Sequence, residues 1–489
     1  KILFNLDDQT TFGEELVLNV LKEDSKTEQH KLATLDGFHW SCEVSKSVSV
    51  ESSITYYYTL VRGDKEMRHE WLVAPHRLDF AAGKSQHYVV YDHWIDVPDD
   101  AFMYSSALTE CIMCCQCEQS AVTNFERTVR LKVRATQPRV GERLGLVGGC
   151  EQLGKWDAQK ALPMTDHDHH EWVVSLDVAE LPRTIEFKFV LLGTDLPMWE
   201  TGMNRTIVLP DTAKGDVLVY ELPQAFFPVY PWKGAGTVVP VFSLRSEGSF
   251  GVGDFGDLKQ MIDWCDKTRQ RILQVLPIND TNMTHTWQDS YPYNSISIYA
   301  LHPQYTDLRQ LPAIKDEALR AQFEALRQEL NALPQIDYER VNNAKNEYLS
   351  LLYQQEGKKV LSSAKFKKFF DEEKHWLEPY AQYCCLRDRY GTADYSQWPD
   401  HKRWDEHDRT ALSSARTKQY KEVAYNYFVQ YILYSQMCEV HEYARQHGVI
   451  LKGDIPIGVN RYGCDVWQEP RYFNLNGQAG APPDDFSVN

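Results

Sequence analysis

Short segments in which apolar and polar residues alternate dominate the chain from residue 1 to about 225. The alternation is visible in LVLNVL, ITYYYTLV and HYVVYDHW, and again in VRLKVRA, RLGLVGG, EWVVSLDV and IEFKFVLL. A strand with one buried face buries every second side chain, and β-branched and aromatic residues suit such a surface. Because no helical period separates these segments, the pattern predicts an all-β region of the sandwich type.

The all-β region divides into two similar halves. Each opens on a Gly-Glu pair followed by an alternating run, FGEELVLNV at 12–20 and VGERLGLVG at 140–148. Each later carries a Trp beside a Glu, in RGDKEMRHEW and in GTDLPMWE. We therefore expect a diverged tandem repeat of two β-sandwiches, one in residues 1–115 and one in residues 126–222.

The hydrophobic period changes at about residue 226, where strand-like and helix-like segments begin to alternate. Three apolar segments are typical of buried parallel strands: VVPVFSL (238–244), RILQVLP (271–277) and VILKGDIPIGV (449–459). Asp254 is placed to cap a helix after the first of them, and a helical period fills residues of about 310–447. This order predicts the first part of a (β/α)8 barrel in residues 226–489, interrupted by a large helical insertion. Because only about three barrel strands fit, we expect further chain to follow.

The composition argues against several classes of function. The 52 basic and 69 acidic side chains leave a net charge of −17, which repels phosphate backbones, so we expect no nucleic-acid partner. No run of about 18 apolar residues occurs, so we expect no membrane-spanning helix. The 11 Cys are odd in number and scattered, which favours reduced thiols in a cytoplasmic protein. Cys111, Cys114, Cys115 and Cys117 are spaced as soft-metal ligands, but no second pair completes the set, and we predict no metal.

Two tryptophans of the second β-region stand among polar residues rather than on an alternating strand. Trp156 lies in LGKWDAQKALPM (153–164) and Trp199 lies in WETGMNR (199–205). Flat rings at a surface stack on the apolar faces of sugar rings, while Lys and Asn side chains bond the hydroxyls. The alternative is that both rings belong to the core, which is the expectation for Trp172 on its alternating strand.

These segments, together with EWVVSL and FKFV, resemble the family 20 carbohydrate-binding modules, which bind starch. The resemblance implies a glucan site formed by Trp156, Lys188, Trp199 and Asn204. The first β-region fits this family poorly, because it has no LGxW segment and only Trp71, in HEWLV, matches the second Trp.

Six ordered blocks carry the most specific resemblance. They are SFGVGDFGDL (249–258), QVLPIND (274–280), DSYPYNSISIYALHPQYTDL (289–308), WLEPYAQYCCLRDRYGTADYSQW (376–398), KGDIPIGVNRYGCDVWQEP (452–470) and AGAPPDDFS (479–487). They resemble glycoside hydrolase family 77, the 4-α-glucanotransferases. The paired modules and the long insertion resemble the branch of that family that includes the plant cytosolic disproportionating enzyme. The resemblance implies a (β/α)8 barrel whose reaction needs no metal or organic cofactor.

The resemblance also implies roles for a few residues. Tyr293 matches a Tyr that stacks on the donor sugar, although the family usually has DSPY, so that Tyr291 is an extra residue. Asp454 matches an Asp that bonds donor-site hydroxyls, with a capping or turn carboxylate as the alternative. Asp484 matches a loop on the acceptor side, with a solvated turn as the alternative. The family's nucleophile, in an Arg-x-Asp-His motif, its acid/base Glu and its stabilising Asp lie further downstream, and we expect them after Asn489.

The leading hypothesis is a 4-α-glucanotransferase that transfers α-1,4-glucan segments between malto-oligosaccharides, or from maltose, glycogen or starch, by a retaining double displacement. The sandwich modules would hold polymeric glucan nearby. One alternative is an α-glucan-binding protein without catalysis. Another is an amylase-like hydrolase on a similar barrel. An Arg-x-Asp-His segment after Asn489 would separate the enzyme from the binding protein, and product analysis would separate transfer from hydrolysis.

Overall fold

The structure is a computed structural model of the 489-residue chain. It describes residues 1–22, 26–45, 52–81, 86–113, 122–139, 141–168, 170–193 and 196–477. The chain divides into two compact units, Lys1–Lys233 and Gly234–Asn489. Among the residues so described, no helix has both the length and the apolar character that a membrane span requires.

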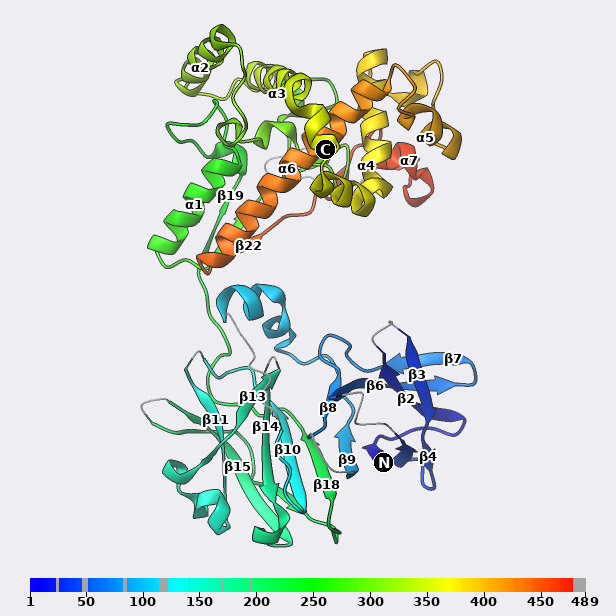
Figure 1. Ribbon diagram of the computed structural model, residues 1–489, viewed down its shortest axis with the longest axis vertical. Coiled ribbons are helices and arrows are strands. Elements are labelled where there is room, and N and C mark those ends of the chain that lie inside the picture. The colour runs from blue at the N-terminus through cyan, green and yellow to red at the C-terminus, as the bar shows by residue number, and fades with distance from the viewer. Residues whose placement is uncertain are drawn as a thin grey trace. The chain divides into compact units, whose positions relative to one another are not determined.

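One sheet runs through the first unit and joins its two β-regions (Figure 1). Its eight strands lie in the order β13 (Thr165–Asp168), β14 (Glu171–Asp177), β10 (Thr128–Arg134), β18 (Asp216–Leu222), β9 (His87–His93), β1 (Ile2–Asp7), β5 (His39–Val44) and β4 (Ala33–Thr34). Strands β9 and β18 pair in parallel from His87 beside Asp216 to Tyr91 beside Tyr220. The two β-regions therefore share a sheet, which the tandem sequence pattern did not predict.

Each β-region adds a smaller sheet of its own. The first consists of β3 (Thr27–Lys31), β2 (Glu14–Leu21), β6 (Ser53–Arg62), β7 (Lys65–His69) and β8 (His76–Asp79). The second consists of β12 (Leu162–Pro163), β11 (Arg143–Gly148), β15 (Thr184–Leu192), β16 (Met198–Trp199) and β17 (Arg205–Val208). Between the sheets lie two hydrophobic cores, and Val217 and Val219 of β18 belong to the core of the first region. The β-sandwich expected in the second region is confirmed, whereas 1–115, 126–222 and 226–489 stay predictions as domain boundaries.

A three-stranded parallel sheet lies at the centre of the second unit. Its strands are β19 (Gly236–Val239), β20 (Ile272–Val275) and β22 (Ile450–Lys452), in that order. The strand expected over 238–244 is shorter than predicted, because Pro240 has no N–H to donate and residues Val241–Ser243 form a 3-10 turn. Three parallel strands agree with the number predicted. Closure into a (β/α)8 barrel is not seen within the described residues and stays a prediction.

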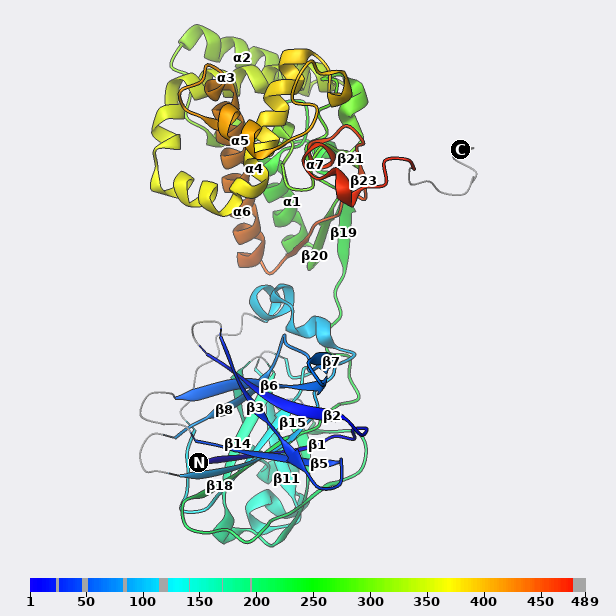
Figure 2. The same cartoon turned by 90° about the vertical axis from the view of Figure 1, so that its right-hand side faces the viewer.

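Helices are the main regular structure of the second unit. Helix α1 (Phe255–Lys267) follows β19, and the region between β20 and β22 contains α2 (Glu317–Asn331), α3 (Tyr338–Leu361), α4 (Ala364–Tyr390), α5 (Glu406–Ser413) and α6 (Tyr420–Gln446). These helices agree with the helical period of residues of about 310–447, while their place as an insertion in a barrel stays a prediction. Helix α6 ends where Gly448 takes a φ of +61°, a conformation that favours glycine. Helices α1 and α6 lie alongside the strands, while α2 to α5 gather beyond one end of them (Figure 2).

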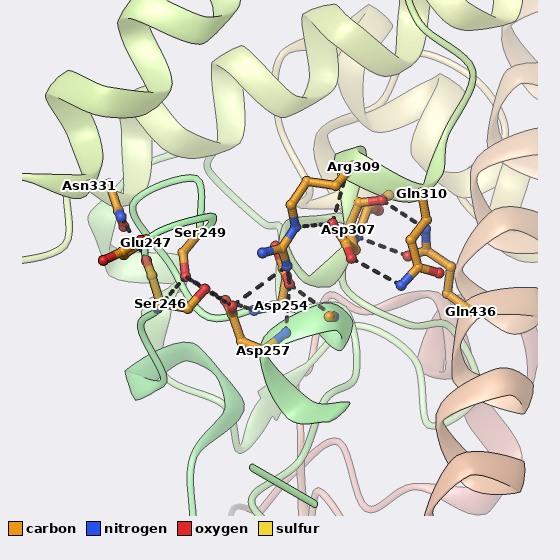
Figure 3. Close-up of polar contacts among 12 residues, drawn as sticks. Ser246, Glu247, Ser249, Asp254, Asp257, Asp307, Arg309, Gln310, Asn331 and Gln436 are labelled. Atoms are coloured by element: carbon orange, nitrogen blue, oxygen red, sulfur yellow. Dashed lines mark hydrogen bonds and ion pairs between the residues drawn. The ribbon is translucent and has the colours of Figure 1, made fainter. Parts of the chain in front are cut away.

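A polar network fixes the start of α1 (Figure 3). Asp254 and Asp257 form the capping box of this helix, each carboxylate accepting from the backbone N–H groups at its first turn. Arg309 donates to Asp254 Oδ1 at 2.8 Å and to Asp307 Oδ1 at 2.6 Å. Gln436 of α6 then bonds both the N–H and the carbonyl of Asp307, each at 2.9 Å. The block 249–258 is thus joined to α6 through Arg309 and Asp307, and the capping box confirms the helix cap predicted at Asp254.

Candidate functional site

Two residues that are 161 positions apart in the sequence meet in the second unit. Tyr293 donates its phenolic hydrogen to Asp454 Oδ2 at 2.6 Å. Asp454 follows β22 by two residues, and Tyr293 precedes β21 (Asn294–Ser295), which pairs in parallel with β23 (Gly458–Val459). Asp454 therefore lies just beyond the C-terminal end of a parallel strand, where α/β folds place their ligand sites.

Of the two tyrosines in the DSYPY segment, Tyr293 is the one that bonds Asp454. This hydrogen bond, and to a smaller extent burial, raises the pKa of Tyr293 above its ordinary value, so its phenol stays protonated near neutral pH. Tyr291 is 62% exposed, and its ring centre lies 5.7 Å from that of Tyr293 at a tilt of 49°. A half-buried ring can stack on a sugar face, and the carboxylate beside it can accept hydrogen bonds from the sugar hydroxyls.

Two buried carboxylates support the loop that carries Tyr293. Asp280 accepts hydrogen bonds from Tyr380 Oη at 2.7 Å and from the N–H of Asn282 at 3.0 Å. Asp289 Oδ2 accepts three consecutive backbone N–H groups, those of residues 283–285, at 2.7 to 3.1 Å. Both lie in sequence blocks noted above, but their supporting role was not predicted. The sequence feature that could have indicated the role of Asp280 is the Asp-x-Asn spacing in QVLPINDTN, which is typical of a turn stabilised by a side chain.

The candidate site of the first unit lies on the outward face of β15. Residues Ile185, Phe187 and Phe189 of this strand are buried in the core. The alternate positions, which include Lys188, therefore face the other side of the sheet. Trp199 on β16 lies opposite Val190 of β15, so its ring belongs to the same outward face, where it is 36% exposed.

Hydrogen bonds attach Lys188 and Asn204 to this face. Lys188 Nζ donates to the carbonyls of Glu200 at 3.1 Å and of Gly202 at 2.6 Å. Asn204 Nδ2 donates to Glu186 Oε1 at 2.8 Å. Lys188 therefore fastens the turn that joins Trp199 to Asn204, with one ammonium hydrogen remaining for a ligand. The amide oxygen of Asn204 is oriented by Glu186, a residue that the sequence analysis did not single out.

Trp156 reaches the same face from the loop after β11. A Cβ atom added to Gly149 would lie 3.4 Å from Trp156 Nε1, so the indole packs against a bare glycine backbone. The N–H of Gly149 in turn donates to the carbonyl of Glu186 at 3.0 Å. Trp156 itself takes a φ of +65°, a strained conformation for a non-glycine residue that is typical of functional loops. The four predicted starch-site residues are thus connected through one strand, β15.

Other sequence expectations have mixed outcomes. Trp172 is 6% exposed and donates to the carbonyl of Ala135 at 3.3 Å, which confirms it as a core residue. Trp71 packs edge-on against Tyr104 with ring centres 5.0 Å apart. Asp484 lies outside the described residues, as does the rest of its loop, and so do Cys114, Cys115 and Cys117.

A cluster of charged side chains lies where the two β-regions meet, and no sequence motif indicated it. His76 contacts Glu70 through Nε2 at 3.0 Å and Glu221 through Nδ1 at 2.8 Å, with all three side chains buried. Burial lowers the pKa of His76, but the charges of Glu221, Glu70 and Asp92 outweigh it, and the net pKa is raised well above its ordinary value. His76 and Glu221 are 145 residues apart, so only the fold reveals their contact.

Two family models match the chain, one in each of its two units. The family model described as 4-alpha-glucanotransferase, of glycoside hydrolase family 77, matches residues 239–489, and the starch binding domain model matches residues 126–218. The first match covers just over half of the chain. The chain belongs to the 4-alpha-glucanotransferase family, glycoside hydrolase family 77, and carries a family 20 starch-binding domain.

Individual relatives are also named 4-alpha-glucanotransferases. The 4-alpha-glucanotransferase DPE2 of Oryza sativa subsp. japonica is 36% identical over 360 residues, which cover 72% of this chain and 37% of the relative. The 4-alpha-glucanotransferase of Chlamydia caviae is 37% identical over 259 residues, covering 52% of this chain and 46% of the relative. The chain thus spans between about a third and a half of the length of these relatives. Among solved structures, the amylomaltase from Streptococcus agalactiae in complex with acarbose matches with 25% identity over 52% of this chain and 51% of that one, at a TM-score of 0.42.

Proposed function

We propose that this protein transfers α-1,4-glucan segments from one sugar chain to the 4-hydroxyl of another, as a 4-α-glucanotransferase. The observation that carries the proposal is the contact between Tyr293 and Asp454. In the proposed site the Tyr293 ring stacks on a glucose ring on the donor side, and Asp454 accepts hydrogen bonds from its hydroxyls. Family membership and the named relatives support the same activity.

The reaction proposed is a retaining double displacement. It needs a nucleophilic carboxylate and an acid/base carboxylate about 5–5.5 Å apart. We assign neither role to a described residue, because Asp454 is engaged with a phenol rather than with a second carboxyl group. In this proposal Tyr293 and Asp454 bind and orient the donor sugar, and Asp484 belongs to the loop that limits water on the acceptor side.

The outward face of β15 is proposed to bind the polymer. Trp156 and Trp199 would stack on glucose rings, Asn204 would accept a hydroxyl hydrogen, and Lys188 would donate its remaining hydrogen. Holding starch or glycogen by one unit raises the concentration of chain ends near the other. The substrates proposed are therefore maltose, malto-oligosaccharides, glycogen or starch.

Incubation with maltotetraose as the sole substrate tests the activity. Products both shorter and longer than maltotetraose, with a constant number of reducing ends, are the result expected for transfer. A rise in reducing ends would instead indicate an amylase-like hydrolase. Retention on insoluble starch without any product would favour the second candidate, an α-glucan-binding protein. That candidate is supported by the starch binding domain model, which matches residues 126–218.

We also propose a cytoplasmic location. Seven cysteines of the described residues form no disulfide: Cys42, Cys150, Cys265, Cys384, Cys385, Cys438 and Cys464. Burial raises the pKa of Cys384 to about 12, so that thiol is protonated and unreactive. Thiols held in this state suit a reducing compartment.

A further inference from the structure

The charged cluster between the two β-regions consists of seven side chains, each exposed by 11% or less. They are Glu70, His76, Asp92, Lys132, Arg134, Glu171 and Glu221. Strands β8 and β9 of the first region supply His76 and Asp92, and β18 of the second region supplies Glu221. The cluster therefore lies on the line where the shared sheet passes from one region to the other.

Three of these side chains converge on one point. His76 Nδ1 lies 2.8 Å from Glu221 Oε2 and 3.8 Å from Asp92 Oδ1, and the three ligand atoms all lie within 4.8 Å of one another. A transition-metal ion with bonds of about 2.0–2.2 Å places its ligand atoms about 3–3.5 Å apart. Small side-chain adjustments would therefore complete three bonds to one ion.

The hydrogen bonding of Asp92 leaves one oxygen aimed at this point. Its Oδ2 accepts hydrogen bonds from the hydroxyls of Tyr56 at 3.0 Å and Tyr58 at 2.8 Å. Its Oδ1 is buried, lies toward His76 Nδ1 and has no hydrogen-bond partner. A buried carboxylate oxygen without a partner is costly, and a bound cation would satisfy it.

The other nitrogen of the imidazole is arranged as in metal sites. His76 Nε2 lies 3.0 and 3.1 Å from the two carboxylate oxygens of Glu70. A carboxylate that accepts the second ring N–H of a metal-binding His fixes the ring and makes the first nitrogen a better ligand. Glu70 is itself fixed, because its carboxylate accepts the backbone N–H groups of Tyr58 and Ile95 at 2.7 and 2.8 Å.

The net charge of the cluster is suited to a divalent cation. Four carboxylates face two permanent cations, Lys132 and Arg134, which leaves an excess of two negative charges when the imidazole is neutral. One proton on His76 offsets half of this excess, and one divalent ion offsets all of it. Uncompensated charge is costly at a site excluded from water. A cavity of about 130 Å³, lined in part by Arg77, Tyr104, Arg134 and Glu171, includes two residues of the cluster in its wall.

We propose that His76, Asp92 and Glu221 bind a divalent transition-metal ion that joins the two β-regions of the first unit. One imidazole and two carboxylates are a ligand set that suits Zn²⁺ or Mn²⁺. Glu70 orients the imidazole, and Lys132, 3.5 Å from Glu221 Oε2, stays beside the ion as part of the charge balance. The ion replaces the proton on Nδ1, and it takes no part in glucan chemistry.

Metal content and spectroscopy of the 489-residue chain test this proposal. The chain is treated with a chelator, dialysed against Mn²⁺ or Zn²⁺, and analysed for bound metal. We expect about one ion of either kind per chain and a higher midpoint of thermal unfolding in its presence. Asp92→Asn and Glu221→Gln should each weaken binding by at least about tenfold. His167→Asn changes a nearby buried His that bonds Asp79 rather than the proposed ligands, and it should keep the metal.

Two further measurements deal with metal binding by cysteines and with variants that do not fold. Zn²⁺ could bind the thiols of Cys111, Cys114, Cys115 and Cys117, so the same titration is made on a variant with all four replaced by Ser. If Asp92→Asn or Glu221→Gln does not fold, X-ray absorption of the Zn²⁺-loaded wild-type chain decides instead. Nitrogen and oxygen neighbours alone support the site. Sulfur neighbours, loss of Zn²⁺ in the Cys variant, or no metal retained by the wild type would each overturn it, the last leaving a proton on His76 as the occupant.

Discussion

The two candidate sites, the outward face of β15 and the Tyr293–Asp454 pair, differ in how far apart their residues lie in the sequence. The face takes Trp156, Lys188, Trp199 and Asn204 from one module, and its contacts pass through a single strand. The pair joins residues 161 positions apart, across the whole helical insertion. The first arrangement depends on local turns and strand alternation, whereas the second depends on the correct folding of a large α/β unit.

The supporting contacts differ in the same way. Lys188 and Glu186 hold the turn of the proposed starch site by bonds to neighbouring backbone and side chains. Tyr293 is held by a loop whose buried carboxylates, Asp280 and Asp289, bond helix α4 and their own backbone. Substitutions in the first site should therefore act on glucan binding and on the local turn, and substitutions in the second should act on the reaction.

The largest effect is expected at Tyr293. Tyr293→Ala removes the stacking ring and should lower the rate of transfer by roughly a hundredfold, about 3 kcal/mol. Tyr293→Phe keeps the ring but loses the bond to Asp454, and should cost about tenfold. The measurement is kcat/KM with a malto-oligosaccharide. Tyr291→Ala is the matched control and should change the rate only a few-fold; a larger loss there than at Tyr293 would reverse the assignment.

The next effect concerns polymer binding by the first unit. Replacing both Trp156 and Trp199 by Ala should weaken retention on starch by about thirtyfold, about 2 kcal/mol, because two stacking surfaces are lost. The thermal midpoint should change little, since neither ring is part of the buried core. Trp264→Ala, which removes an exposed Trp of helix α1, serves as the control. Unchanged retention in the double variant would exclude this face as the starch site.

The difference between the two sites also explains what the sequence could predict. The alternation that buries Phe187 and Phe189 also indicates that Lys188 faces outward, and the polar neighbours of Trp156 indicate a surface ring. The sequence predicted Tyr293 and Asp454 one by one, through motifs, but not their contact. It gave no sign of the β9–β18 pairing or of the contact between His76 and Glu221, because each joins segments more than a hundred residues apart without local signal.

A smaller effect should separate positioning from sugar contact at Lys188. Lys188→Met keeps the aliphatic stem but removes both bonds to the carbonyls of Glu200 and Gly202. We expect starch binding to fall by about fivefold, about 1 kcal/mol, and amide hydrogen exchange to rise over the 200–204 turn. Arg205→Lys provides a comparison, because it perturbs the neighbouring ion pair with Glu200. Weaker binding without faster exchange would assign Lys188 to direct sugar contact.

The last effect is a pH dependence in the stability of the first unit. Burial raises the pKa of Asp79, but hydrogen bonds from His167 and Arg77 outweigh it, so the net pKa lies below the ordinary value. Asp79 therefore stabilises the folded state above the unfolded pKa of about 3.9, and the contribution is lost as the pH falls further, toward its folded pKa. Asp79→Asn should lower the free energy of unfolding by about 1 kcal/mol at neutral pH, and the difference from wild type should shrink as the pH falls from about 4 to about 3. Urea unfolding, followed by Trp fluorescence across this range, measures it. A difference that stays constant with pH would mean that Asp79 contributes through packing rather than through its charge.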